Sequence, residues 1–249
     1  MGIERHKDLI DINQELWHRK PILRTVYTDL YRTMQRYLSR VSGRNLELGS
    51  GMGTISEVMP DCMRTDLFHY PWLDAVENAY SLSFADGSIS NLLMVDVFHH
   101  LRYPGNALKE FQRVLTPGGR LILMEPGLGL MGRIIYEWMH IEPVGKAADV
   151  TWFAPPDWSP DEMDYYAAQG NATWIFTRKT FADQLSEWNI LEVRGFSALA
   201  YAASGGYSGP QLYPTAAYPL VKSLEKFLQL FPAIFTTRLM VVLEKKMLK

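Results

Sequence analysis

The stretch Leu46–Ile55, which reads LELGSGMGTI, decides the fold of this chain. It places Gly49, Gly51 and Gly53 directly after an apolar run that contains Glu47. Glycine adopts positive φ angles without strain and lets a ligand approach where a Cβ atom would collide. The spacing is G-x-G-x-G, which differs from the G-x-G-x-x-G of a dinucleotide site. We therefore interpret the stretch as a strand, a ligand-binding loop and the start of a helix.

The carboxylate of Glu47 indicates the charge of the ligand. A pyrophosphate at a helix N-terminus is held by backbone N–H groups and the positive end of the helix dipole, and a carboxylate in the same loop would repel it. An acid there suits a ligand with positive charge, such as the amino group or sulfonium of S-adenosylmethionine. Asp66, at the end of the next expected strand, can accept hydrogen bonds from two ribose hydroxyls.

The rest of the chain alternates between helical and strand patterns. Apolar residues at spacings of three and four predict helices, and short apolar runs predict buried strands. Thr116–Gly119 (TPGG) predicts a type II turn, and Thr54 is a candidate N-cap. The expected helices lie near 23–38, 54–59, 104–115, 128–140, 178–188 and 216–231, with a shorter one before Pro21. The first expected strand is a short apolar run that ends at Glu47, and the others lie near 62–67, 91–98, 120–125, 190–200 and 237–244. This alternation predicts an α/β fold with a doubly wound parallel sheet.

We expect one domain over residues 1–249. Its parts are N-terminal helices (1–43), a cofactor-binding core (44–126), a cap insertion (127–177), and a C-terminal core (178–249) with a second insertion at about 201–234. Both insertions leave from strand carboxyl ends, the edge where ligands bind in open α/β sheets. The insertions are therefore expected to cover the site.

Five segments, in this order and spacing, resemble the class I S-adenosylmethionine-dependent methyltransferases, in particular the type 11 group. They are LELGSGMG, RTDL, ENAYSLSFADGSI, VDVFHHL and RVLTPGGRLILMEP, within residues 44–126. The resemblance implies a Rossmann-like seven-stranded sheet with an antiparallel last strand, and S-adenosylmethionine as the cofactor. The cofactor-binding residues that it implies are Glu47, Gly49, Ser50, Gly51, Gly53, Asp66, Leu67, Asn78, Ala79, Asp96, Val97 and Phe98.

Asn78 departs from the pattern of this family, in which the adenine position is commonly Asp. Asn can still accept a hydrogen bond through its carbonyl oxygen, so we expect weaker or reoriented adenine contacts. Three later segments are similar to a bacterial branch associated with surface-polysaccharide biosynthesis. They are YEWMHIEP (Tyr136–Pro143), GNATWIF (Gly170–Phe176) and SGGYSG (Ser204–Gly209), and they suggest a sugar-linked substrate.

His99, His100 and His140 are the candidates for a catalytic base, which a hydroxyl acceptor needs for removal of its proton. Adjacent histidines at a strand end are expected to point to opposite sides and not to share a metal, so no metal site is predicted. The candidates for substrate contact are Tyr136, His140, Glu142, Asn171 and Trp174, for which surface hydrogen bonding or core packing is the alternative.

These features predict methyl transfer from S-adenosylmethionine, with S-adenosylhomocysteine as the product, to the hydroxyl of a sugar or sugar-lipid. One alternative is a methyltransferase acting on a quinone or another lipid precursor, and a second is a cofactor-binding subunit without activity. A nicotinamide oxidoreductase conflicts with the glycine spacing and with Glu47.

Composition limits the partners and the compartment. The 25 Lys and Arg residues nearly balance the 27 Asp and Glu residues, so no nucleic-acid surface is predicted. Cys62 is the one cysteine, which excludes an internal disulfide and fits a reducing, cytoplasmic compartment, and no export signal or membrane span is recognised. The aromatic and basic region that contains Phe227, Phe231 and Phe235 could contact a membrane peripherally, but we favour core packing for it.

Overall fold

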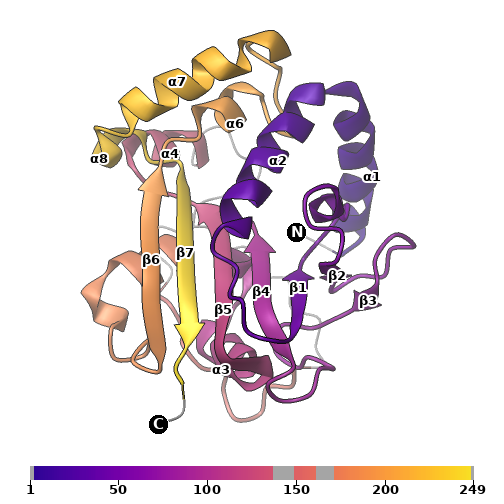
Figure 1. The fold of residues 1–249 in the computed structure, drawn as a ribbon, viewed down its shortest axis with the longest axis vertical. Coiled ribbons are helices and arrows are strands. Elements are labelled where there is room, and N and C mark those ends of the chain that lie inside the picture. Colours follow the sequence, from indigo (N-terminus) through magenta and orange to yellow (C-terminus); the bar gives the residue numbers. More distant parts are fainter. Residues whose placement is uncertain (1–2, 137–148, 161–170, 248–249) are drawn as a thin grey trace.

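The computed structural model describes residues 3–136, 149–160 and 171–247, and these form a seven-stranded sheet with helices on both faces (Figure 1). The strand order is β3-β2-β1-β4-β5-β7-β6, and β7 runs antiparallel to both of its neighbours. This confirms the predicted doubly wound sheet and its antiparallel last strand. The strands are β1 (Arg44–Leu48), β2 (Met63–Asp66), β3 (Ala75–Val76), β4 (Ile89–Val95), β5 (Leu115–Pro126), β6 (Trp188–Phe196) and β7 (Arg238–Lys245).

The helices are α1 (Ile3–Arg19), α2 (Pro21–Gln35), α3 (Pro104–Val114), α4 (Leu130–Ile134), α5 (Asn171–Thr177), α6 (Leu199–Ala203), α7 (Tyr218–Leu228) and α8 (Pro232–Phe235). Short 3₁₀ turns add η1 (Thr54–Glu57), η2 (Phe98–His100), η4 (Lys179–Phe181) and η5 (Thr215–Ala217). In Figure 1 the arrows of β4, β5 and β6 point towards the end of the molecule where α2, α6 and α7 lie. The sheet edge expected to bind ligands is therefore the edge next to these helices.

Alternating side chains of the central strands build two cores. Leu93, Ile122 and Met240 pack on one face with α2 and η1, while Leu92, Leu121 and Val241 pack on the other face with α3 and α5. All six are fully buried, as expected for strands covered on both faces. These two layers hold the strand ends in fixed positions at the carboxyl edge.

The N-terminal half differs from the sequence prediction in five details. α1 has 17 residues and is longer than α2, which has 15, so the first helix is not the shorter one. The helix expected at 54–59 is the single 3₁₀ turn η1, and Thr54 does not cap it because Gly53 is the N-cap residue. β4 ends at Val95 instead of Phe98, and the edge strand β3 was not predicted because two residues carry too little pattern.

In the TPGG stretch, β5 already begins at Leu115, and Gly118 has a φ of +77°, as a type II turn requires at its third position. The strand therefore starts before the turn and continues after it. The register between β4 and β5 shifts at this place.

The helix expected at 178–188 was also wrong. The helical segment is α5, seven residues earlier, and it is followed by η4 and by turns up to β6. Leu185 and Trp188 are buried, so successive turns bring the apolar residues of this stretch to the core without a continuous helix. α4 covers only the start of the helix expected at 128–140, and positions after 136 lie outside the described residues.

The favoured core packing of the C-terminal aromatic region is contradicted by its exposure. Phe227 is 59% and Phe231 is 48% exposed, and Leu220, Leu224, Leu230 and Ile234 are exposed as well. The amphipathic pattern of α7 is real, but its apolar side faces away from the sheet.

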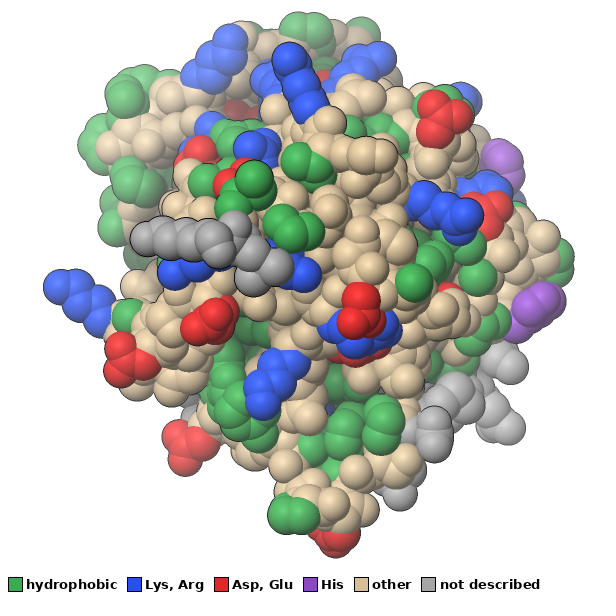
Figure 2. Space-filling model, turned by 60° about the horizontal axis from the view of Figure 1, so that its bottom comes forward, with side chains coloured by type: hydrophobic (Ala, Val, Ile, Leu, Met, Phe, Trp, Pro, Cys, Tyr) green, Lys and Arg blue, Asp and Glu red, His purple; other side chains and the backbone are tan. Residues whose placement is uncertain are grey.

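Charged and apolar side chains are interspersed on the face in Figure 2, which does not show one continuous basic patch. No helix among the described residues is long and apolar enough to span a membrane.

Candidate functional site

The glycine loop joins β1 to η1 at the carboxyl edge of the sheet. Gly49, Gly51 and Gly53 all have positive φ angles, of +71°, +51° and +70°. A Cβ atom on Gly49 would lie 2.3 Å from a methyl carbon of Val97, which follows β4. Position 49 therefore needs glycine for its backbone conformation and for the close approach of the two loops. Ser50, between the first two glycines, is buried.

Glu47 lies buried beneath this loop, with 1% of its surface exposed. The hydroxyl of Tyr31, from α2, donates a hydrogen bond to its Oε1 atom at 2.8 Å. Its Oε2 atom has no hydrogen-bond partner among the described residues. Burial raises the pKa of the Glu47 carboxyl to about 7. The carboxyl thus has one oxygen that is available as a hydrogen-bond acceptor. A cation placed beside it would favour its ionised form.

Asp66 ends β2 and ties it to the glycine loop. Its Oδ2 atom accepts a hydrogen bond from the Gly51 N–H at 2.9 Å, and its Oδ1 atom accepts one from the Phe68 N–H at 3.1 Å. A carboxylate offers about four lone-pair sites in all, so the chemistry of Asp66 is compatible with accepting from ribose hydroxyls. Leu67, the next residue, is half-buried.

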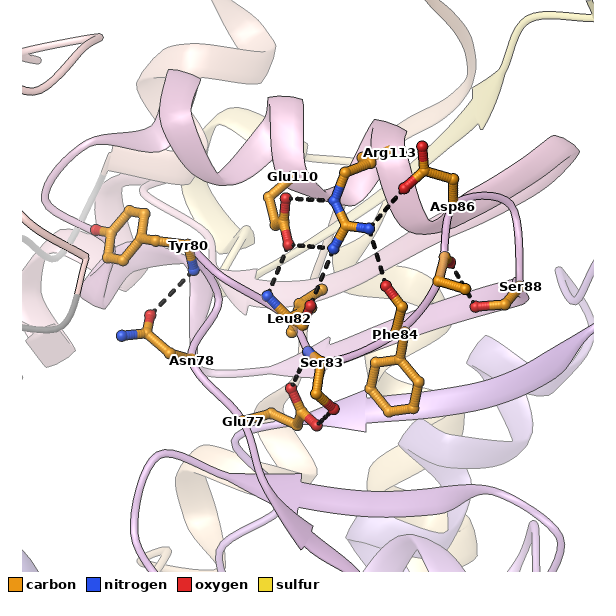
Figure 3. A network of polar contacts seen from close by, with 11 residues as sticks. Glu77, Asn78, Tyr80, Leu82, Ser83, Phe84, Asp86, Ser88, Glu110 and Arg113 are labelled. Carbon is orange, nitrogen blue, oxygen red and sulfur yellow. Dashed lines mark hydrogen bonds and ion pairs between the residues drawn. The ribbon is translucent and has the colours of Figure 1, made fainter.

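Asn78 lies near the start of the loop that leads from β3 to β4 (Figure 3). Its Nδ2 atom donates to the Pro160 carbonyl at 2.5 Å, and its Oδ1 atom accepts from the Tyr80 N–H at 3.0 Å. The side chain therefore joins the segment after β5 to the expected adenine position. The neighbouring Ala79 is half-buried against the core.

Arg113, on α3, fixes the remainder of this loop (Figure 3). Its guanidinium donates to Glu110 at 2.7 and 2.9 Å, to Asp86 at 2.7 Å, and to the carbonyls of Leu82 and Phe84. The FADGS sequence forms a turn, with a positive φ at Gly87. The loop is thus held from the α3 side and presents Asn78 and Ala79 at its start.

Glu125 is a second buried carboxylate at the carboxyl edge, and the sequence did not single it out. Its Oε1 atom accepts from the N–H groups of Val97, at 3.1 Å, and Phe98, at 2.8 Å. Its Oε2 atom accepts from the His99 N–H at 3.3 Å and lies 2.5 Å from His99 Nδ1. The carboxylate of β5 therefore organises the turn η2 that follows β4.

We expected His99 and His100 to point to opposite sides, but their rings lie side by side. Their ring centroids are 4.0 Å apart. The reason is that both residues lie in the 3₁₀ turn η2, where successive side chains do not alternate as they do along a strand. His99 is buried against Glu125, and His100 is half-buried beside it.

Arg238, which is buried, forms an ion pair with the half-buried Asp96, and the sequence also missed this pair. Asp96 has a φ of +57°, the one positive value among the non-glycine residues described. The Nη1 atom of Arg238, at the start of β7, bonds to its Oδ1 atom. The guanidinium carbon lies 4.3 Å from the centre of the Tyr201 ring. The Nε atom of Arg238 has no hydrogen-bond partner among the described residues.

The substrate candidates occupy different places. Tyr136 is buried and donates to the Thr237 carbonyl at 3.0 Å, and burial raises the pKa of its hydroxyl. Asn171 is buried at the start of α5, and Trp174 lies 4.8 Å from the Arg178 guanidinium. His140 and Glu142 lie outside the described residues. The described residues contain no group of three or more His, Cys, Asp or Glu side chains able to hold a metal ion.

Comparisons with known proteins agree with this fold. Residues 46–123, from β1 to β5, match the family described as a methyltransferase domain. No curated protein matches the chain.

Similar solved structures include a SAM-dependent methyltransferase of Thermotoga maritima (TM-score 0.55, 14% identity, covering 96% of this chain and 99% of that one). Another, from Archaeoglobus fulgidus, has a TM-score of 0.53 and 12% identity, and covers 89% of this chain and 94% of that one. A third comes from the complex between the Haloferax volcanii Trm112 methyltransferase activator and a methyltransferase (TM-score 0.51, 15% identity, 98% and 94% covered). The chain thus has the fold of class I methyltransferases.

Proposed function

We propose that this chain is an S-adenosylmethionine-dependent methyltransferase that methylates a hydroxyl oxygen of a sugar or sugar-lipid. The matched methyltransferase domain and the fold support both the enzyme class and the cofactor. The observation that carries the proposal is the free Oε2 atom of the buried Glu47, directly beneath a loop of three glycines. A free buried acceptor at this place suits the cationic end of the cofactor and disfavours a dinucleotide pyrophosphate.

The residues present fit the cofactor along the whole edge. Glu47 and the glycine loop would hold its amino acid end, Asp66 its ribose, and Asn78 with Ala79 its adenine. When bound, S-adenosylmethionine supplies a methyl group already activated for transfer by its sulfonium. The share of the protein is to align the acceptor and to exclude water.

Proton removal from the acceptor hydroxyl is assigned to the histidine turn η2. His99 is buried and has its Nδ1 atom against Glu125, so its role is to fix the turn. His100 is half-buried against the His99 ring and is the better candidate for the base. His140 stays a candidate on its sequence alone.

Two sequence features support the acceptor and the compartment. The segments around Tyr136, Asn171 and Ser204 resemble enzymes of surface-polysaccharide biosynthesis, which favours a sugar-linked hydroxyl. Cys62 is the one cysteine of the chain, and this fits the reducing cytoplasm.

The test is transfer of a labelled methyl group by the purified protein to sugars, sugar-lipids, quinones and small acids. His100→Ala is expected to lower kcat by roughly a hundredfold, the usual contribution of a general base, and to leave cofactor affinity unchanged. His18→Ala is the matched control, because His18 is an exposed histidine on α1. Transfer only to nitrogen or carbon would contradict O-methylation. Tight cofactor binding with no transfer to any acceptor class would favour a non-catalytic subunit.

A further inference from the structure

The helices α7 and α8 present a surface of large apolar side chains that no other described element covers. We call this the α7–α8 surface. Its exposed fractions range from 44% at Ile234 to 74% at Leu220. It consists of Leu220, Leu224, Phe227, Leu230, Phe231 and Ile234. Soluble proteins rarely expose so many neighbouring large apolar residues without a partner for them.

The outward direction of these side chains is fixed by polar anchors on the inner side of α7. Glu225 is buried, and its Oε1 atom accepts a hydrogen bond from the Ala200 N–H at 2.7 Å. The Lys222 ammonium lies 2.6 Å from the other oxygen of Glu225. The hydroxyl of Tyr218 donates to Asp29 on α2. A rotation of α7 that buried Leu220 and Phe227 would break these contacts and expose Glu225.

The charge of the surface has one sign. Between residues 205 and 236, Glu225 is the one acidic residue of the sequence, and it is buried and paired. The basic residues of that segment are Lys222 and Lys226, and Lys226 is exposed. The α7–α8 surface therefore combines apolar and aromatic side chains with positive charge and without an exposed carboxylate.

α4 extends this surface next to the candidate site. Leu130 and Ile134 are 57% and 50% exposed, and Arg133 adds a further exposed positive charge. α4 and α8 are in contact and lie side by side in Figure 1. Thr236 directly follows α8, and its carbonyl accepts at 3.1 Å from the N–H of Gly129, which directly precedes α4. Arg238, the partner of Asp96, is two residues further along the chain.

We propose that the α7–α8 surface, together with α4, docks on a bilayer that contains anionic lipid. Apolar and aromatic side chains framed by lysine and arginine are the pattern of helices that lie in a membrane interface. The negative surface of such a bilayer complements the positive charges of Lys226 and Arg133. The docked surface borders the Asp96–Arg238 end of the site, so an acceptor anchored in the membrane could reach it without leaving the bilayer.

The experiment is cosedimentation of the purified full chain with two kinds of vesicle, one of phosphatidylcholine and one of equal parts of phosphatidylcholine and phosphatidylglycerol. Binding is expected to the mixed vesicles and to weaken as salt is added. Phe227→Ser with Leu230→Ser should lower the partition coefficient roughly thirtyfold or more, since both side chains would leave the interface. Lys226→Gln should lower it about fivefold on the mixed vesicles and leave it unchanged on phosphatidylcholine.

The matched control is Ile12→Ser with Ile190→Ser, which removes two exposed apolar side chains on α1 and β6. Circular dichroism and S-adenosylmethionine binding establish that every variant is folded. Absence of binding by the native chain, or equal binding by native chain and Phe227→Ser/Leu230→Ser, would overturn the proposal. The proposal would also be overturned if the native chain formed a dimer that does not bind vesicles and if Phe227→Ser/Leu230→Ser dissociated this dimer. No cofactor turnover enters the measurement, so its failure is distinguishable from failure of the proposed methyl transfer.

Discussion

Glu47 and Glu125 are both buried carboxylates at the carboxyl edge of the sheet, but their surroundings differ. Glu125 accepts three backbone N–H groups and lies against a histidine nitrogen, whereas Glu47 accepts one tyrosine hydroxyl and has a free oxygen. The same side chain therefore serves the fold in one strand and is available to a ligand in another. Burial alone does not distinguish the two roles, but the count of satisfied acceptors does.

The largest expected effect is on the stability of the Glu125 variant. Glu125→Gln replaces an acceptor by an amide NH₂ group that faces the donors of η2, and should lower the free energy of unfolding by about 3 kcal/mol or more. Glu47→Gln keeps the hydrogen bond from Tyr31 and should change it by no more than about 1 kcal/mol at pH 5, where the folded protein keeps this carboxyl protonated. Urea denaturation of both variants measures the difference. Equal losses would contradict the separate roles.

The second prediction uses the raised pKa of Glu47. Its ordinary value is 4.5 and its value in the folded protein is about 7, so the folded protein binds this proton more tightly than the unfolded chain. The stabilising contribution is complete below pH 4.5 and is lost as pH rises through 7, by up to about 3 kcal/mol. Without the cofactor, the native chain should therefore lose more stability than Glu47→Gln between pH 5 and pH 8. Parallel profiles from thermal denaturation would show that Glu47 does not titrate in this range.

Two glycines of the loop that follows β1 differ in the space that a Cβ atom would have. Gly49→Ala adds a Cβ atom 2.3 Å from Val97, while Gly53→Ala meets its nearest atom, in the flexible Arg64 side chain, at 3.3 Å. Both positions have φ near +70°. We expect Gly49→Ala to cost about 3 kcal/mol of stability and Gly53→Ala about 1 kcal/mol. Denaturation curves decide this, and a smaller cost at position 49 would mean that the loop moves away from Val97.

The smallest effect is expected at the surface. The Asp86 side chain is 80% exposed, although it forms an ion pair with Arg113. Asp86→Ala should cost less than about 1 kcal/mol, because water screens the pair and Glu110 still holds the guanidinium. A cost above 2 kcal/mol in urea denaturation would assign this pair a structural role comparable to that of Glu125.

The parts of the fold that the sequence predicted are those with a local signal. The glycine spacing located the loop after β1, and buried apolar runs located β4 and β7. The roles of Glu125 and Arg238 were not predicted, because their partners, His99 and Asp96, are distant in sequence and come close only when the strands pair.

Helical periodicity did not predict that the apolar side of α7 is exposed. The pattern shows that the helix has an apolar side, but a sequence does not tell whether another element covers that side. The polar contacts of Tyr218 and Glu225 determine which side of α7 faces solvent, because they leave Leu220 and Phe227 exposed.

The most direct test of the site is calorimetric titration with S-adenosylmethionine of the native protein and of Glu47→Gln, each from pH 6 to pH 8, with NAD as a control. If the free oxygen of Glu47 holds the cationic end of the cofactor, affinity of the native protein rises with pH as this carboxyl ionises near pH 7. Glu47→Gln should then bind at least roughly tenfold more weakly and without this pH dependence, and NAD should not bind. Equal affinity of the two proteins at every pH, or tighter binding of NAD, would contradict the role given to Glu47.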